Sequence, residues 1–228
     1  ALASELKALL QLPGVPRQLD RQSVLRYLTL QYVPAPYSML QGFRRLPPAS
    51  MAILKGGDFR IERYWSPPYD EPDLARSAMD DWREELRHEM TEAVRLRLRS
   101  DVPVGAFLSG GIDSTIVTGL MQQQMDQPVQ TFSIGFPVAA FDERAYARQA
   151  SEMLATEHHE AVVEPDAISM LPKLIWHYDE PFSDSSAIPT MYLSEMTREH
   201  VTVALTGDAG DELFCGYDRY RAVRIAAM

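Results

Sequence analysis

The chain is poor in cysteine, in lysine and in long apolar runs. Its 228 residues include one cysteine, Cys215, so no disulfide can form within the chain and a cytoplasmic setting is the simpler expectation. No apolar run approaches the roughly 20 residues that a membrane-spanning helix requires. No basic segment followed by an apolar one opens the chain, so we expect neither a membrane protein nor an amino-terminal targeting signal.

Positive charge is also scarce. Lysine and arginine number 22 against 32 aspartates and glutamates, which gives a formal net charge of −10, and only three of the basic residues are lysines. Such a surface repels a phosphate backbone, so we expect no nucleic-acid partner. A hydrophobic content of 46% at this length suits one large domain, or one domain with part of another. The first residue is Ala1 rather than Met, and Met228 falls inside a predicted helix, so a fragment is expected.

The composition of the sequence and its predicted secondary structure change near residue 66. Residues 1–65 predict two short helices, one over 4–10 and one over 22–32, followed by a hairpin over 51–65. Three prolines between residues 66 and 72 disfavour both helix and sheet. We therefore expect a first domain over 1–65, a linker over 66–77 and a second domain over 78–228.

The sequence pattern of the second domain predicts an α/β fold. An amphipathic helix is expected over about 77–98, with Met79, Trp82, Leu86 and Met90 as a core stripe. Four short apolar runs then alternate with helical segments, which favours a parallel sheet with helices on both faces. The predicted strands are 102–108, 129–136, 161–163 and 201–205. The predicted helices are 115–124, one capped by Asp142, 167–178, which Pro172 would kink or restart, and 187–200.

The first of these strands ends in a loop suited to a polyphosphate. Two adjacent glycines, Gly110 and Gly111, let the backbone turn tightly and approach an anion, toward which the N–H groups of the following helix point. The hydroxyls of Ser109, Ser114 and Thr115 add donors. A Walker A loop would carry Lys here, whereas this loop carries Asp113, an acid that suits a phosphate site if a divalent cation lies between them.

The fourth strand ends in a second polar loop. Asp208, Asp211 and Glu212 are interleaved with Gly207 and Gly210, a composition poor for sheet or helix interior. If this loop lies beside the first, Asp211 supplies a second carboxylate to the metal. A solvated acidic turn is an equally weighted alternative.

These two loops resemble a known family. The signature from Ser109 to Ser114 looks like that of the PP-loop ATP pyrophosphatases, whose fold is adenine nucleotide alpha hydrolase-like. The stretch 99–108 before it and 206–217 after strand 201–205 resemble glutamine-hydrolysing asparagine synthetases. Residues 3–9 and 32–36 look like the end of that family's amino-terminal glutaminase domain, so residues 1–65 would be a partial α+β glutaminase segment.

The resemblance implies roles for individual residues. Asp113 and Asp211 would bind Mg²⁺, and Asp208 matches an acidic position tied to formation of the aspartyl-adenylate. ATP would be held at the adenine and ribose by Leu108, Ile134, Thr206 and Gly207, and at the pyrophosphate by Ser109, Gly110, Gly111 and Ser114. The glutaminase nucleophile would be an amino-terminal cysteine, which this chain lacks, and a lysine active in adenylation would lie beyond Met228.

The implied reaction converts aspartate to asparagine through β-aspartyl-AMP, with ATP and glutamine-derived ammonia as the other substrates. The resemblance also allows a homodimer. Two alternatives stay open: a related amidotransferase or β-lactam synthetase-like enzyme that adenylates another carboxylate, and a non-catalytic nucleotide-binding homologue.

Three further features have competing interpretations. His158 and His159 are adjacent, so on a strand they point to opposite faces, and we expect a surface strand edge rather than a metal site. The polar segment 178–186 either caps the next helix or contacts substrate. Cys215 is expected to be packed rather than reactive.

Overall fold

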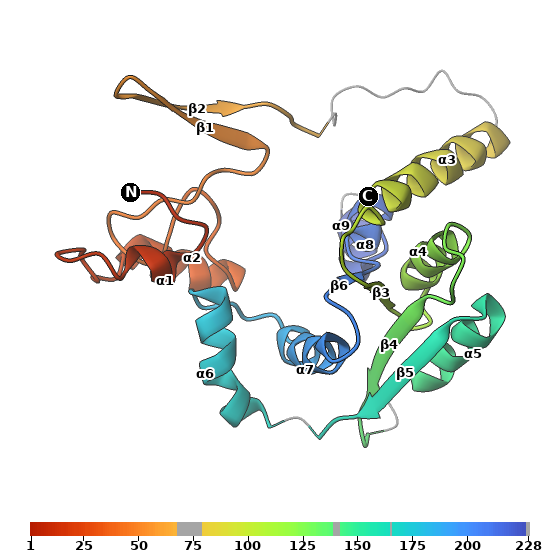
Figure 1. The fold of residues 1–228 in the computed structure, drawn as a ribbon. Helices are drawn as coiled ribbons and strands as arrows, with labels where there is room; N and C mark the ends of the chain where they lie inside the picture. Colours follow the sequence, from red (N-terminus) through yellow and green to blue (C-terminus); the bar gives the residue numbers. More distant parts are fainter. Residues whose placement is uncertain (68–78, 139–141, 165, 227–228) are drawn as a thin grey trace. The chain divides into compact units, whose positions relative to one another are not determined.

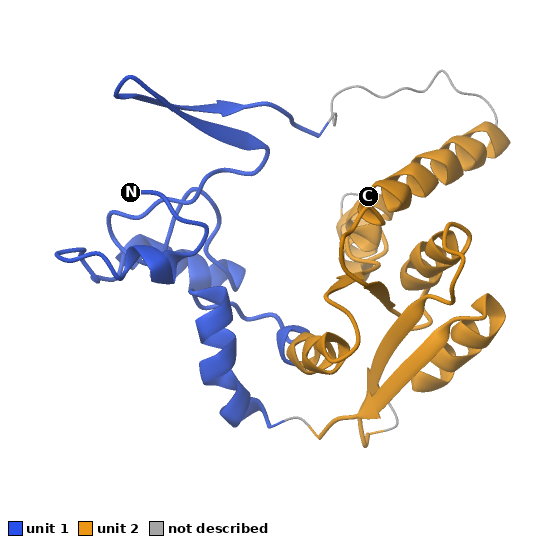
Figure 2. Cartoon of the chain, in the orientation of Figure 1, with its two compact units in different colours: residues 1–74, 166–188 blue, residues 75–165, 189–228 orange. Residues whose placement is uncertain are grey.

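The computed structural model describes residues 1–67, 79–138, 142–164 and 166–226 (Figure 1). The chain divides into two compact units (Figure 2): residues 1–74 with 166–188, and residues 75–165 with 189–228. Segment 166–188 falls inside the range expected for the second domain, yet it groups with the amino-terminal residues. Most of the expected linker over 66–77 lies outside the described residues.

The second unit is built on a parallel sheet. Its strands are β3 (Val104–Phe107), β4 (Gln130–Gly135), β5 (Glu157–Val162) and β6 (Val203–Leu205). Their order is β5-β4-β3-β6, and each neighbouring pair is parallel. This confirms the predicted fold class. Strand β5 begins four residues before the predicted range, because its polar start pairs with β4 although it is not apolar.

Helices connect these strands as predicted. The sheet is preceded by α3 (Met79–Arg97), and β3 and β4 are followed by α4 (Ile112–Gln122) and α5 (Arg144–Leu154). Further along the chain come α7 (Ala187–Arg198), α8 (Gly210–Phe214) and α9 (Asp218–Ala226). The cap of α5 differs from the prediction, because Glu143 occupies the N-cap position while the Asp142 carboxylate accepts a bond from the Arg144 amide at 3.2 Å.

Helices approach both faces of the sheet. His158 bonds to the hydroxyls of Thr131 and Ser133, on the face where Ser151 of α5 meets Thr156. His159 points to the other face, where its ring stacks on Phe132 and lies 4.1 Å from the ring of His200, just beyond α7. The expectation that the two histidines face opposite ways is therefore confirmed. Within the described ranges, no cluster of three or more His, Cys, Asp or Glu could hold a metal ion.

The main core lies between α3, α4 and the sheet. Its buried members are Val94, Ala106, Leu120, Met121 and Val129. The predicted core stripe on α3 is wrong over its first half, since Met79 is 68% exposed and Trp82 and Leu86 are also exposed. The helix enters the core only through its later turns, where Met90 and Val94 pack. Periodicity marks an apolar face but does not say how much of it is covered.

The first unit contains α1 (Leu6–Leu9), α2 (Arg21–Leu30), the antiparallel hairpin of β1 (Ser50–Lys55) and β2 (Asp58–Arg63), and α6 (Ala167–Tyr178). Asp20 caps α2 by accepting from the Ser23 amide, and Asp166 caps α6 by accepting from two amides. Helix α6 runs as one element through Pro172, without the predicted restart. No helix in the described part of either unit is long and apolar enough to cross a membrane.

Candidate functional site

A cavity of about 470 Å³ lies in the second unit, at the carboxyl ends of β3, β4 and β6. Ligands of open parallel sheets bind at this edge. All but one of the eleven predicted site residues line it: Leu108, Ser109, Gly111, Asp113, Ser114, Ile134, Thr206, Gly207, Asp208 and Asp211. The predictions from two separate loops thus fall on one space.

The loop after β3 is organised by serine hydroxyls. The Ser114 hydroxyl donates to the Gly111 carbonyl at 3.2 Å and accepts from the Ser109 amide at 3.3 Å. The Ser109 hydroxyl lies 3.1 Å from that of Ser114 and accepts from the Gly111 amide. These bonds fix the loop at the amino-terminal end of α4, where backbone N–H groups lack helical partners and favour an anion. Thr115, expected to add a donor, does not line the cavity.

Gly110 makes the turn without lining the cavity. Its φ is +80°, which side-chain-bearing residues rarely adopt, and a β-carbon there would lie 2.3 Å from the backbone carbon of Tyr146. The loop therefore passes in close contact with the first turn of α5. The predicted pyrophosphate contact from Gly110 has no support in this geometry, and the residue's requirement for glycine has a steric cause.

The loop after β6 packs directly on the loop after β3. A β-carbon on Gly207 would lie 2.7 Å from the amide nitrogen of Ser114, and one on Gly210 would lie 2.4 Å from Cγ of Asp113. Gly207 therefore permits a close approach of the two backbones, and Gly210 leaves room for the carboxylate of Asp113. Because β3 and β6 are hydrogen-bonded neighbours, their following loops emerge side by side. This packing argues against the alternative of a solvated acidic turn, which would stand apart from the first loop.

Two carboxylates in this cavity suit a hydrated divalent cation. Asp113 and Asp211 both line the space, and over the described residues neither side chain has a hydrogen-bond or ion-pair partner. Mg²⁺ is typically bound by one or two carboxylates together with substrate phosphates and water, so a pair suffices where a cluster of three is lacking. Asp113 lies in the first turn of α4, which further favours negative charge there.

Several lining residues were not predicted from the sequence. Phe107, Phe132, Ser133 and Phe136 flank predicted positions at the ends of β3 and β4, where such residues fit the interior of a strand equally well. The remaining ones come from α5 and α7: Glu143 at the N-cap of α5, Ala147 within α5, and Pro189, Thr190 and Leu193 of α7. No local motif marks these helices. The only signal near α7 was the polar segment 178–186 before it.

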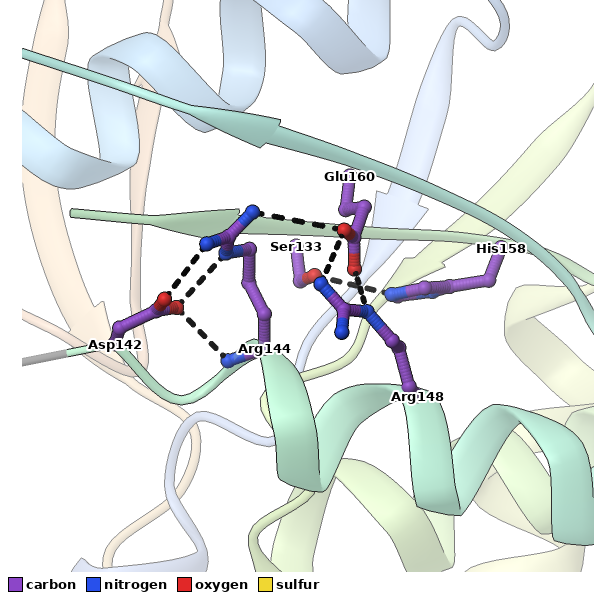
Figure 3. A network of polar contacts seen from close by, with 6 residues as sticks. All are labelled: Ser133, Asp142, Arg144, Arg148, His158 and Glu160. Carbon is purple, nitrogen blue, oxygen red and sulfur yellow. Dashed lines mark hydrogen bonds and ion pairs between the residues drawn. The ribbon is translucent and has the colours of Figure 1, made fainter. Parts of the chain in front are cut away.

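An arginine-carboxylate network braces α5 against the sheet (Figure 3). Arg144 donates to both oxygens of Asp142, at 2.9 and 2.7 Å, and Arg148 donates to both oxygens of Glu160, at 2.7 Å each. Arg144 also lies 3.6 Å from Glu160. A β-carbon on Gly135 would lie 2.2 Å from Nε of Arg144, so glycine at the end of β4 is needed for this pairing. Both guanidinium groups are therefore engaged by protein carboxylates.

The network shifts the titration of its members. The Arg144 guanidinium lowers the pKa of Asp142 to about 2, and Arg148 lowers the pKa of Glu160. Burial lowers the pKa of His158 below its ordinary value. Near neutral pH the carboxylates thus carry charge and His158 is neutral, able to share a hydrogen bond of 3.1 Å with Ser133.

Two further sequence interpretations concern segment 178–186 and Cys215. Asp184 accepts from the Ser186 amide at 2.8 Å in a turn directly before α7, a bond that involves no amide of the helix itself, so the choice between capping and substrate contact for segment 178–186 stays a prediction. Cys215 is exposed, at the end of α8 with a φ of +58°, so the prediction of a packed cysteine is wrong. It follows a helix of five residues with no buried member, which leaves it nothing to pack against there.

Comparison with known proteins identifies the family. The model of the asparagine synthase family matches residues 85–227, and that of a glutamine amidotransferase domain matches residues 1–65. The chain belongs to the asparagine synthase family. It is 38% identical over 221 residues to a putative glutamine-hydrolysing asparagine synthetase 2 of Methanocaldococcus jannaschii, covering 94% of this chain and 42% of that protein. It is 33% identical to glutamine-hydrolysing asparagine synthetase 1 of Bacillus subtilis, covering 96% of this chain and 34% of that protein.

The chain thus spans well under half of the length of these relatives in the asparagine synthase family. Among solved structures, an ammonia-dependent NAD synthetase from Campylobacter jejuni is similar with a TM-score of 0.40 and 19% identity. That similarity covers 59% of this chain and 60% of the other.

Proposed function

We propose that the protein is a glutamine-dependent asparagine synthetase, and that this chain carries its ATP-pyrophosphatase half after the end of a glutaminase domain over residues 1–65. One observation carries the proposal: two loops from distant parts of the sequence, each with an unpaired carboxylate, line a single cavity beside a helix amino terminus. The family membership over residues 85–227 supports it.

Each loop has a defined task in this proposal. Ser109, Gly111 and Ser114 form the pyrophosphate site, in which the serine hydroxyls and the backbone N–H groups of the first turn of α4 are the donors, because the amides of Ser109 and Gly111 are already bonded within the loop. Leu108, Ile134, Thr206 and Gly207, which line the same cavity, hold the nucleoside. Gly110 shapes the turn through its positive φ.

The chemistry is attack of the aspartate β-carboxylate on the α-phosphorus of ATP, with release of pyrophosphate and capture of β-aspartyl-AMP by ammonia. Asp113 and Asp211 would hold Mg²⁺, which neutralises charge on the leaving pyrophosphate. Asp208 lies in the same cavity and is proposed to act in the adenylation step. Positioning and charge stabilisation would supply most of the rate enhancement.

Exchange of labelled pyrophosphate into ATP tests the proposal in the full-length protein. Aspartate should support exchange, and other carboxylic acids should not. Exchange with another acid alone would replace asparagine synthesis by a β-lactam synthetase-like or related amidotransferase activity. A folded, ATP-binding protein with no exchange for any acid would be a non-catalytic homologue.

A further inference from the structure

Glu143 is a carboxylate of the cavity that the proposed reaction does not use. It lines the same space as Asp113, Asp208 and Asp211, yet it follows β4, whereas those three follow β3 and β6. Among the residues that the structure describes, its carboxylate has no hydrogen-bond or ion-pair partner. A carboxylate without a protein partner at the wall of a binding cavity is available to a ligand, and it can only accept hydrogen bonds.

The main chain of Glu143 is held by α5, but its side chain is not. Glu143 is the N-cap residue of this helix, and its carbonyl accepts from the amides of Tyr146 at 3.0 Å and Ala147 at 3.2 Å. Its carboxylate makes no capping bond to the helix amides. Capping of α5 therefore does not explain a carboxylate at this position, although the backbone that carries it is fixed in place.

The residues on either side of Glu143 lie against the end of β4. Asp142 and Arg144 form the bidentate pair drawn in Figure 3. A β-carbon on Gly135 would lie 2.2 Å from Nε of Arg144 and 2.3 Å from Oδ1 of Asp142. Gly135 directly follows Ile134, which is proposed to hold the nucleoside. Glu143 is thus fixed next to the strand end at which the nucleoside is expected.

The ribose of ATP offers the donors that suit this carboxylate. The phosphates are anionic, and the donors for them gather at the start of α4. The adenine amine stands beside a ring nitrogen that accepts hydrogen bonds, so a carboxylate at that edge would face a repelling lone pair. The ribose carries two neighbouring hydroxyls, which can donate to the two oxygens of one carboxylate. Acidic residues bind ribose hydroxyls in the same way in dinucleotide-binding folds.

The ammonium of aspartate fits this position less well. Aspartate must reach the α-phosphorus, and Asp208, which is proposed to act in adenylation, follows β6. Glu143 follows β4, and β3 separates β4 from β6 in the sheet. The ribose is therefore the substrate group that best fits Glu143.

We propose that Glu143 binds the ribose hydroxyls of ATP and thereby makes the site select ribonucleotides over deoxyribonucleotides. The inference rests on the proposed function, because it requires ATP to react in this cavity. A hydrogen bond to a charged acceptor is stronger than one between neutral groups, so its loss should lower kcat/KM by about tenfold to a hundredfold. Removing the hydroxyl and removing the carboxylate delete the same bond, so the two losses should not add.

Aspartate-dependent pyrophosphate exchange in the full-length protein tests this inference, with ATP, 2′-deoxy-ATP and 3′-deoxy-ATP compared as substrates. In the wild-type protein, kcat/KM for ATP should exceed that for at least one deoxynucleotide by about tenfold or more. In Glu143→Ala, kcat/KM for ATP should fall to the value for that deoxynucleotide, whereas the value for the deoxynucleotide should change by less than about twofold. Glu143→Gln, which keeps a neutral acceptor of nearly the same size, should fall between wild type and Glu143→Ala.

The matched control is Glu152→Gln, on the same helix. Glu152 is exposed and does not line the cavity, so its substitution should change neither kcat/KM nor the nucleotide preference. Equal use of all three nucleotides by the wild-type protein would overturn the inference. So would an equal fall for all three in Glu143→Ala, which would indicate general damage, or a rise in the KM for aspartate with the preference retained, which would assign Glu143 to the ammonium. Absence of exchange with any nucleotide in the wild-type protein would instead refute the proposed function.

Discussion

Replacing Gly210 by alanine should disable the site while leaving the fold intact. The new β-carbon would lie 2.4 Å from Cγ of Asp113 and 2.7 and 2.8 Å from its two oxygens. Ordinary contacts begin near 3.4 Å, so the carboxylate or the loop must move by about 1 Å. A misplacement of about 1 Å can cost a factor of about 100 in rate, and we expect that loss in kcat/KM for pyrophosphate exchange. This corresponds to about 2.7 kcal/mol of transition-state stabilisation.

Stability should change much less than activity in Gly210→Ala. Gly210 is the first residue of α8 and is not among the glycines with positive φ, so alanine is conformationally acceptable there. The clash is with the far end of a side chain that can rotate, which should keep the net change in unfolding free energy below about 1 kcal/mol.

The matched control for Gly210→Ala is Gly119→Ala in the middle of α4. Its β-carbon would meet only Cδ2 of Leu154, at 3.3 Å, so exchange should stay near the wild-type rate. Exchange is measured in the full-length protein across a magnesium titration, with urea unfolding alongside. If Gly210→Ala exchanges within twofold of wild type at every magnesium concentration, the two loops do not act on one ion and the reasoning fails.

Three further substitutions probe separate parts of the second unit. Asp113→Asn should abolish magnesium-dependent exchange and leave glutamine hydrolysis in the full-length protein measurable, while Asp126→Asn, in the exposed turn after the same helix, should change neither; equal loss in both would refute the metal role. Gly110→Ala should lower the free energy of unfolding by about 2 kcal/mol or more, since its φ is +80° and it abuts the backbone of α5; an unchanged urea midpoint would contradict this. Asp142 has a pKa of about 2 because Arg144 holds its charged form, so its contribution is present above the unfolded pKa near 4 and is lost as pH falls toward 2. The urea midpoints of wild type and Asp142→Asn should therefore differ at pH 7 and converge below pH 4, and a difference independent of pH would exclude the proposed linkage.

The fold class could be predicted because strands covered on both faces are rich in apolar residues, even where polar residues such as Gln130, Thr131 and Ser133 of β4 interrupt them. Such runs at β3 and β4 stand out between amphipathic helices, and the predicted alternation matches the observed element order. Strand β5 was predicted to start too late, because its first residues, Glu157, His158 and His159, are polar. They pair with β4, and the ring of His159 also contacts that of His200, just beyond α7. The exposure of the first half of the apolar stripe on α3 could not be predicted for a related reason. Whether an apolar helix face is buried depends on elements that lie far away in the sequence.

The candidate site could be predicted wherever its residues form a local motif. Glycines beside hydroxyls and acids, at the ends of predicted strands, mark the loops after β3 and β6. The walls from α5 and α7 carry ordinary helix residues such as Ala147 and Leu193, whose role depends only on where the helix lies. Gly110 shows the converse case: the motif contains it, but its positive φ and its contact with α5 explain the glycine without a ligand.

The convergence of the two acidic loops has a topological cause. From β3 the chain moves outward through β4 to β5, and then returns to pair β6 with the free edge of β3. The sheet order therefore reverses at β3, and the connections on its two sides separate at the carboxyl ends, leaving a crevice between the loops that follow β3 and β6. Nearly 100 residues separate Asp113 from Asp211, yet parallel pairing of Val104 with Val203 brings the strands before them into register. A cation site split between two loops thus needs the whole sheet to be folded, so magnesium should bind the native state and not isolated segments of the chain.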